Sequence, residues 1–408
     1  MTARAGLSDG ARRRVAFYSH DAQGLGHTRR NIVIAAALVA ARPETDVLLL
    51  TGSPEATALP LPPSTEVLTL PTLYKHADGH YSARVLSSPL VEILAMRSRL
   101  IETALTAFGP DLFVVDKVAR GVLGSLDRAL TALRGNGRTR AVLGLRDVLD
   151  EAEVARREWE SASTTEAIRD LYDVVWVYGD PTVYDPVVEY ALPTSVAERV
   201  VYTGYLAGPR PPGLQIRYRA VDGVGLPPKP FVLCLVGGGQ DDVMLARSFV
   251  SAPMPPGRKG VLLTGPHMPA GERQELLELA AARPDMTVHE LVTSAHDFIS
   301  RAEAAVCMGG YNSVCELLGA GCPALVVPRV TPRMEQTLRA QRLARAGWVD
   351  VLPAAGATPA RIGGWLTWRT HTNRRRRRRI ALDGLARIPR LAERLQGSVG
   401  PKAAHVAV

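Results

Sequence analysis

The sequence predicts an α/β protein made of two doubly wound parallel sheets that face each other across a cleft. Short apolar runs rich in β-branched residues alternate with helix-like stretches along the chain, which is typical of buried parallel strands covered by helices on both faces. A stretch rich in proline and glycine interrupts this pattern, which then starts again. The 408 residues are also too many for one ordinary core and enough for two.

The strand-like runs form two groups. Those of the first half lie at residues 14–19, 47–51, 65–70, 111–116, 141–145 and 174–178. Those of the second half lie at residues 231–236, 261–264, 287–291, 304–308, 324–327 and 348–352. The segment GYLAGPRPPGLQIRYRAVDGVGLPPKP between them is typical of an interdomain hinge. We therefore expect a first domain over residues 1–205, a linker over 206–230, a second domain over 231–360 and a helical, arginine-rich segment over 361–408.

Composition and charge narrow the class of protein. No apolar run is long enough to span a membrane, and the N-terminus lacks the apolar segment of a signal peptide, so we expect a cytoplasmic protein. The net charge is +9, and the arginines at 374–379 supply six of it. A solvated helix face is the simplest interpretation of this run. The alternative interpretation is that the run associates weakly with the inner face of an anionic membrane. No RNA- or DNA-binding module accompanies the run, so no specific nucleic-acid partner is expected.

The sequence offers no obvious metal ligands. Its cysteines, Cys234, Cys307, Cys315 and Cys322, have no C-x-x-C spacing, so we expect reduced, buried thiols and not a zinc site. The chain also contains no D-x-D motif that would hold a metal ion against a diphosphate. We expect neither a metal nor a cofactor.

A glycine loop, SHDAQGLGHTRRN, follows the first strand and precedes a helix-like run. It resembles the G-x-G-x-x-G fingerprint of dinucleotide-binding proteins in Gly24 and Gly26, but Arg29 stands where the third small residue belongs. The next strand ends at Thr51 with no acid to bind a ribose. The loop therefore argues against NAD binding.

Two glycine loops in the second half are better phosphate sites. GGGQDD at residues 237–242 and GGYNS at residues 309–313 each follow a strand and open a helix, where backbone N–H groups and the helix dipole favour anions. Asn312 and Glu316 are four residues apart and share a helix face, so Glu316 is placed to accept both hydroxyls of a ribose. Helix-dipole complementarity is its alternative role. Glu335 and Gln336 open a further helix at the same sheet edge, where they can hold sugar hydroxyls.

These residues resemble a nucleotide-sugar glycosyltransferase of the GT-B fold, in which two Rossmann-like domains face each other across a cleft. The family is the MurG-like glycosyltransferase family 28, that of the lipid-intermediate enzyme of peptidoglycan synthesis, and in particular its bacterial "predicted glycosyltransferase" branch. The resemblance runs from residue 14 to about residue 352 and includes GGYNSVCELL…G.PALVVPR…EQ…RA..L...G. The chain departs from the family where YTGYLAGPR replaces the usual T-G-N-P-V-R, which leaves the identity of the sugar open.

The resemblance implies that the donor binds the second domain. Its diphosphate would contact the two glycine loops at Gly238, Gly239, Gln240, Gly310, Tyr311, Asn312 and Ser313. The main chain near Leu291 would recognise the base, and Glu316 the ribose diol. Glu335 and Gln336 would hold the sugar, and Arg333 would add an anion contact. The donor is expected to be UDP-linked, for example UDP-N-acetylglucosamine.

Inverting sugar transfer needs a base that takes the acceptor proton and positive charge that stabilises the leaving diphosphate. His27, which matches the histidine of the family's glycine loop, and His20 are both candidates for the base. Asp116 ends a neighbouring strand and could orient whichever histidine serves. Helix N-termini, with Arg29 or Arg333, would stabilise the diphosphate. The loops expected on the acceptor side carry Asp21, Gly24, Gly26, Arg29 and Asp147.

The acceptor itself is not encoded in a recognisable motif. It would be a small molecule or a lipid-linked intermediate with a hydroxyl or amine, and it would meet the variable loop LYKHADGHYSARV at residues 73–85. An epimerase or hydrolase acting on a nucleotide sugar is the alternative on the same architecture. A non-catalytic protein that binds nucleotide sugars is the alternative from another class.

Overall fold

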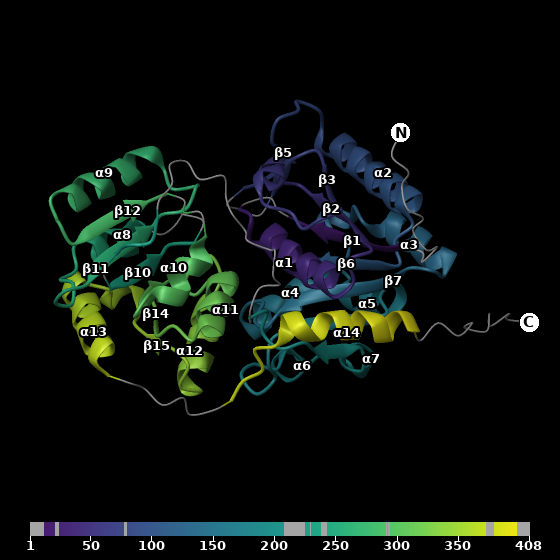
Figure 1. Cartoon of the computed structure of the whole chain (residues 1–408). Coiled ribbons are helices and arrows are strands. Elements are labelled where there is room, and N and C mark those ends of the chain that lie inside the picture. The colour runs from purple at the N-terminus through teal and green to yellow at the C-terminus, as the bar shows by residue number, and fades with distance from the viewer. Residues whose placement is uncertain are drawn as a thin grey trace, which may run out of the picture.

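The computed structural model describes residues 12–20, 24–76, 80–207, 225–228, 230–237, 243–290, 292, 294–372 and 379–397. The chain forms two α/β domains side by side (Figure 1), each a parallel sheet with helices on both faces. The predicted fold class is thereby confirmed. Each predicted strand lies within two residues of an observed one.

The sheet of the first domain has the order β3-β2-β1-β6-β7-β8-β9, and all of its strands are parallel. Its strands are β1 (Arg13–Ser19), β2 (Thr45–Thr51), β3 (Thr65–Thr69), β6 (Leu112–Asp116), β7 (Arg140–Arg146), β8 (Val174–Tyr178) and β9 (Val200–Tyr202). A separate antiparallel hairpin of β4 (Leu73–Lys75) and β5 (Tyr81–Ala83) lies in the loop expected to meet the acceptor. Neither the hairpin nor β9 was predicted, because such short strands carry too few apolar residues to show a pattern.

Successive side chains along a strand point to opposite faces of this sheet, and each face is covered by its own set of helices. Val15 and Phe17 share a buried cluster with α1, whereas Ala16 and Tyr18 belong to the cluster on the opposite face with α2 and α3. The helices and 3₁₀ turns of the domain are α1 (Gly26–Ala41), η1 (Pro54–Ala58), α2 (Leu90–Phe108), η2 (Val122–Gly124), α3 (Asp127–Asn136), α4 (Ala152–Ser161), α5 (Thr164–Leu171), α6 (Pro186–Glu189) and α7 (Thr194–Ala197). Strand residues that point to opposite faces therefore build two separate cores.

The second domain repeats the plan with a sheet of order β12-β11-β10-β13-β14-β15, again parallel. Its strands are β10 (Phe231–Leu235), β11 (Lys259–Leu263), β12 (Met286–His289), β13 (Ala305–Cys307), β14 (Ala324–Val326) and β15 (Asp350–Val351). Its helices and 3₁₀ turn are α8 (Val243–Val250), α9 (Ala270–Ala281), α10 (Ala295–Arg301), α11 (Tyr311–Ala320), α12 (Glu335–Arg345), η3 (Ala354–Gly356) and α13 (Pro359–His371). The four cysteines are buried and free, as predicted.

The last helix, α14 (Gly384–Gly397), returns to the first domain and packs against α1 (Figure 1). The Tyr205 N–H donates to the Ala381 carbonyl over 2.9 Å, and the Gly384 N–H donates back to the Tyr205 carbonyl over 3.0 Å. Ile388 and Ala392 join the α1-side core. Of the arginine run, Arg374 to Arg378 lie outside the described residues, and Arg379 is exposed. None of the described helices is both long enough and apolar enough to cross a membrane.

Candidate active site between the two domains

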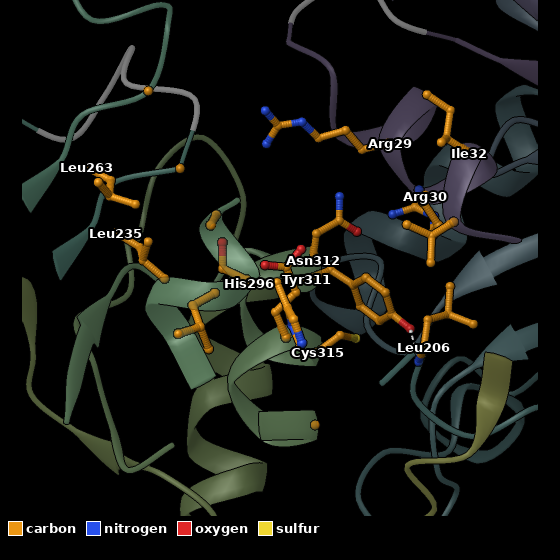
Figure 2. A pocket seen from close by; sticks show the side chains of 18 of the residues that line it. Arg29, Arg30, Ile32, Leu206, Leu235, Leu263, His296, Tyr311, Asn312 and Cys315 are labelled. Carbon is orange, nitrogen blue, oxygen red and sulfur yellow. Dashed lines mark hydrogen bonds between the residues drawn. The ribbon is translucent and has the colours of Figure 1, made fainter. Parts of the chain in front are cut away.

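A pocket of about 1400 Å³, counting its solvent-open part, lies between the domains. Its floor is formed by the carboxyl ends of β10 and β11, by α10 and by the first turns of α11, and its opposite wall by α1 (Figure 2). In parallel α/β sheets, ligands bind beyond the carboxyl ends of the strands. The pocket therefore lies where a ligand of this architecture is expected.

Several predicted donor residues line this pocket. Tyr311, Asn312, Ser313 and Glu316 all face it from α11, so the expected shared face of Asn312 and Glu316 exists. The pocket also contains Glu290 and His296, which sequence reasoning missed. Gly238, Gly239, Gln240 and Leu291 lie outside the described residues.

The turn into α11 depends on a glycine. Gly309 has a φ of +88°, and a Cβ atom there would lie 2.7 Å from Val326 Cγ1. Gly310, which follows, has open space where a side chain would be, so the backbone before α11 is accessible. A bare backbone at a helix N-terminus is suited to anions. The side chain of Asn312 spans the domains, because its Nδ2 donates to the Gly26 carbonyl over 2.9 Å.

His27 and Asp116 form a hydrogen-bonded pair at the edge of the first sheet. Nδ1 of His27, in the first turn of α1, lies 2.9 Å from Oδ2 of Asp116, the last residue of β6. Burial by itself would raise the pKa of Asp116, but Arg30 and His27 outweigh it and lower this pKa to about 2. Asp116 is therefore ionised and can accept a proton from Nδ1 of His27, an arrangement that leaves Nε2 free to take a proton.

His20 has a different environment. Its Nε2 lies 3.0 Å from the Tyr81 hydroxyl of the β4–β5 hairpin. Burial, followed by the nearby charges of His27 and Arg97, lowers the pKa of His20 to about 3. His20 therefore stays neutral at physiological pH and joins the hairpin to the cleft edge. Both histidines were candidates for the base from the sequence. In the structure, Asp116 contacts His27, whereas His20 contacts Tyr81.

Asp147 and Arg333, both expected near substrate, contact the opposite domain. Asp147 pairs with Arg339 of α12 over 2.7 Å, and both side chains are fully buried. Arg333 lies 3.1 Å from Asp150 and 2.5 Å from Glu158. Neither Asp147 nor Arg333 lines the described pocket. These charges hold the two domains together in the structure.

The remaining residues of the opening loop have separate roles. Arg29 lines the pocket from α1 (Figure 2). Gly24 has a φ of +74° with open space around it, and Gly26 begins α1. Asp21 lies outside the described residues.

Glu335 and Gln336 are buried at the start of α12. With its amide oriented to satisfy both atoms, Gln336 donates to the Met308 carbonyl over 2.7 Å and accepts from Arg329 Nε over 3.2 Å. One oxygen of Glu335 lies 3.5 Å from Arg329 and 3.9 Å from Arg146. The other, Oε2, has no hydrogen-bond partner among the described residues. Glu335 therefore keeps an acceptor available in the wall between the domains.

Three cations near the His27–Asp116 pair were not singled out from the sequence. Arg30 contacts both oxygens of Asp116 over 2.8 and 2.5 Å. Arg146 is the last residue of β7, and Lys117 directly follows β6 at the same sheet edge. Burial and the charge of Arg146 lower the pKa of Lys117 to about 7. The positions of Arg146 and Lys117 directly after predicted strands were the available signal, but arginine and lysine at strand ends are too common to stand out.

Comparison with known proteins gives this site a context. Residues 233–376 match the model of the glycosyltransferase family 28 C-terminal domain. This match covers most of the second domain, and the chain as a whole shares its two-domain fold with solved glycosyltransferases. No curated protein matches the sequence as a whole.

The solved structures that this chain resembles share its fold at low sequence identity. The calicheamicin glycosyltransferase CalG4 is 18% identical, with a TM-score of 0.58 over 96% of this chain and 100% of its own. MurG of Acinetobacter baumannii is 16% identical, with a TM-score of 0.51 over 96% of both chains. The glycosyltransferase VinC, solved with dTDP, is 15% identical, with a TM-score of 0.56 over 95% of this chain and 98% of its own.

Proposed function

We propose that this protein is a glycosyltransferase that transfers a sugar from a nucleoside-diphosphate donor to a hydroxyl or amine acceptor and inverts the anomeric centre. The proposed donor is a UDP-sugar. The observation that carries the proposal is the His27–Asp116 pair, which lies beside a pocket lined by Asn312 and Glu316 of the other domain. A base on one domain and a nucleotide pocket on the other are what a two-substrate transfer requires.

In the proposed reaction, Nε2 of His27 takes the proton from the acceptor oxygen or nitrogen as that atom attacks the anomeric carbon. The bond from the anomeric carbon to the donor diphosphate breaks, and its electron pair leaves with the diphosphate. Asp116 stabilises the imidazolium that forms. Attack from the face opposite the leaving group inverts the anomeric centre.

Donor binding is proposed to use the described pocket. Glu316 accepts the ribose hydroxyls, and the N-terminus of α11 faces the diphosphate. The free Oε2 of Glu335 supports a hydrogen bond to the donor sugar. Arg29 from α1 and the partly buried Arg146 from β7 supply positive charge from the first domain. We propose that these groups stabilise the leaving diphosphate without a metal ion, because the sequence has no D-x-D motif.

The acceptor is proposed to enter beside the β4–β5 hairpin, where Tyr81 contacts His20. An amphiphilic or lipid-linked acceptor would agree with weak, peripheral contact between Arg374–Arg379 and an anionic cytoplasmic membrane face. Deletion of residues 374–379 is expected to reduce sedimentation with anionic vesicles and leave turnover of a soluble acceptor unchanged. Equal sedimentation of the full-length protein and the deletion variant would show that the arginine run is a solvated surface without membrane contact.

A panel of UDP- and dTDP-sugars, read by ligand-induced thermal shift and followed by an acceptor screen, tests the proposed function. We expect one donor to stabilise the protein and to be consumed only with an acceptor. Rapid conversion of the donor without an acceptor would favour the epimerase or hydrolase alternative. Tight donor binding with no turnover under any condition would favour a nucleotide-sugar-binding protein.

A further inference from the structure

Arg30 joins the proposed base to the other domain. Its guanidinium contacts both oxygens of Asp116, and its Nη2 lies 2.9 Å from Nδ1 of His27. The Arg30 side chain is 3% exposed and that of Asp116 is fully buried. Nη2 of Arg30 and Nδ1 of His27 thus both lie within hydrogen-bond distance of Oδ2 of Asp116. Because both nitrogens converge on one oxygen, Arg30 limits how the carboxylate can rotate beneath the imidazole.

Arg30 also packs on the first residue of the proposed donor helix. Its guanidinium carbon lies 5.5 Å from the ring centroid of Tyr311, and that of Arg339 lies 5.5 Å from the same centroid. The Tyr311 hydroxyl donates to the Tyr178 carbonyl over 2.8 Å, so the ring is anchored in the first domain. Asn312, Ser313 and Glu316, which line the pocket, follow Tyr311 on the same helix.

We propose that Arg30 is a positioning residue that aligns the His27–Asp116 pair and couples it, through Tyr311, to the nucleotide-binding helix α11. The inference rests on the proposed function for its catalytic meaning, but the geometry that it describes exists without substrate. Arg30 holds Asp116 as an ionised acceptor facing Nδ1 of His27. It also places a permanent cation beside the ring, and a cation opposes protonation of a neighbouring imidazole.

Removal of the Arg30 charge has a defined effect on His27. With the cation gone, Asp116 acts on the imidazole alone and favours the imidazolium. The midpoint of the His27 ring titration in Arg30→Met should therefore lie above that of wild type, whereas Arg30→Lys, which keeps the cation, should resemble wild type. The titratable groups that surround the three side chains are common to all variants: His20 after β1, Lys117 after β6, Arg146 of β7, Tyr178 of β8 and Tyr311 of α11.

The first experiment follows the His27 ring by NMR in histidine-labelled full-length protein between pH 4 and pH 9, after circular dichroism has shown that each variant is folded. A rise in the titration midpoint in Arg30→Met that Arg30→Lys does not share supports the proposal. The same midpoint in all three proteins overturns it. If Arg30→Met does not fold, Arg30→Gln provides the same loss of charge with a polar side chain that can still donate to Asp116.

A second experiment tests the coupling with UDP as the probe. Binding of UDP, measured by calorimetry, should shift the His27 resonances in wild type and in Tyr311→Phe, which keeps the ring. Tyr311→Leu should bind UDP without that shift, because the contact between Arg30 and the ring is lost. Bound UDP that leaves His27 unchanged in wild type, or shifts it equally in Tyr311→Leu, overturns the coupling.

Activity separates this inference from the proposed function. The acidic limb of the kcat/KM profile should move in Arg30→Met by the same amount as the NMR midpoint. A shifted midpoint with an unshifted acidic limb would support the role of Arg30 and contradict the assignment of His27 as the base. The two proposals therefore fail on different measurements.

Discussion

Asp147 at the end of the first sheet and Arg339 on α12 of the second domain form an ion pair whose side chains are both fully buried. Two guanidinium nitrogens of Arg339 reach the carboxylate over 2.7 to 3.0 Å, and the Tyr205 hydroxyl donates to its other side over 3.0 Å. The pair lies next to the predicted linker, because Tyr205 is the last residue before it. The Tyr205 ring also stacks on that of Tyr311, with 6.3 Å between the ring centroids. A charge that the sequence pattern placed near substrate therefore serves the domain interface.

Removing one partner of this pair should destabilise the protein strongly. Asp147→Ala leaves the Arg339 guanidinium buried without its counter-charge, and we expect a loss of about 3–5 kcal/mol in the free energy of unfolding. Urea denaturation followed by circular dichroism measures it. The matched control is Asp170→Ala, which removes the exposed partner of Arg169 and should cause no measurable change. Similar stabilities of the two variants would contradict the importance of the buried pair.

Glu316 should determine donor affinity. If its carboxylate accepts the ribose hydroxyls, Glu316→Ala leaves a buried diol unpaired, at a cost of about 1–3 kcal/mol, or roughly a 5- to 150-fold weaker Kd. Isothermal calorimetry with UDP measures this loss. Glu278→Ala, on the exposed face of α9, is the control and should bind like wild type. Undiminished binding by Glu316→Ala would remove the residue from the site.

His27 should affect the chemical step and not nucleotide binding. We expect His27→Gln to lower kcat by about 10²- to 10⁴-fold, the usual contribution of a general base, with UDP affinity unchanged. Asp116→Asn should lower kcat as well, because an amide cannot stabilise the imidazolium as a carboxylate does. His20→Gln serves as the comparison, since His20 is tied to Tyr81. If His20→Gln abolishes turnover while His27→Gln retains it, the two roles are exchanged.

Lys117 should give the stability of the protein a defined pH dependence. Burial and the charges of Arg146 and Arg333 lower its pKa from 10.5 to about 7, so the unfolded chain binds this proton more tightly than the folded one. The loss of folding free energy caused by protonated Lys117 is therefore complete below pH 7. It disappears as the pH rises toward 10.5. Lys117→Met should therefore be more stable than wild type at pH 6 and equally stable near pH 10.5, measured by thermal unfolding. Lys259→Met is the control and should not show this difference between the two pH values. An equal difference at both pH values would show that the lysine charge does not cause the effect.

Local patterns were sufficient for the main parts of the fold. The strands β1 and β10, the glycine turns after them and the helices that follow depend on which residues alternate or recur within a short segment, and this information is contiguous in the chain. The shared face of Asn312 and Glu316 follows from helix geometry in the same way. Short elements such as β9 and the β4–β5 hairpin escaped, because three residues show no reliable period.

The sequence by itself determined two doubly wound domains, a glycine turn before α11 and two histidines at the edge of the first sheet. Only the tertiary structure decided which histidine meets Asp116, that Arg30 shares this carboxylate, and that Asp147 and Arg333 face charges of the opposite domain. It also returned α14 to the first domain. The physical reason is that charge pairing depends on distance in space, and each of these contacts joins segments separated by scores to hundreds of residues. Periodicity within a segment carries no information about that distance.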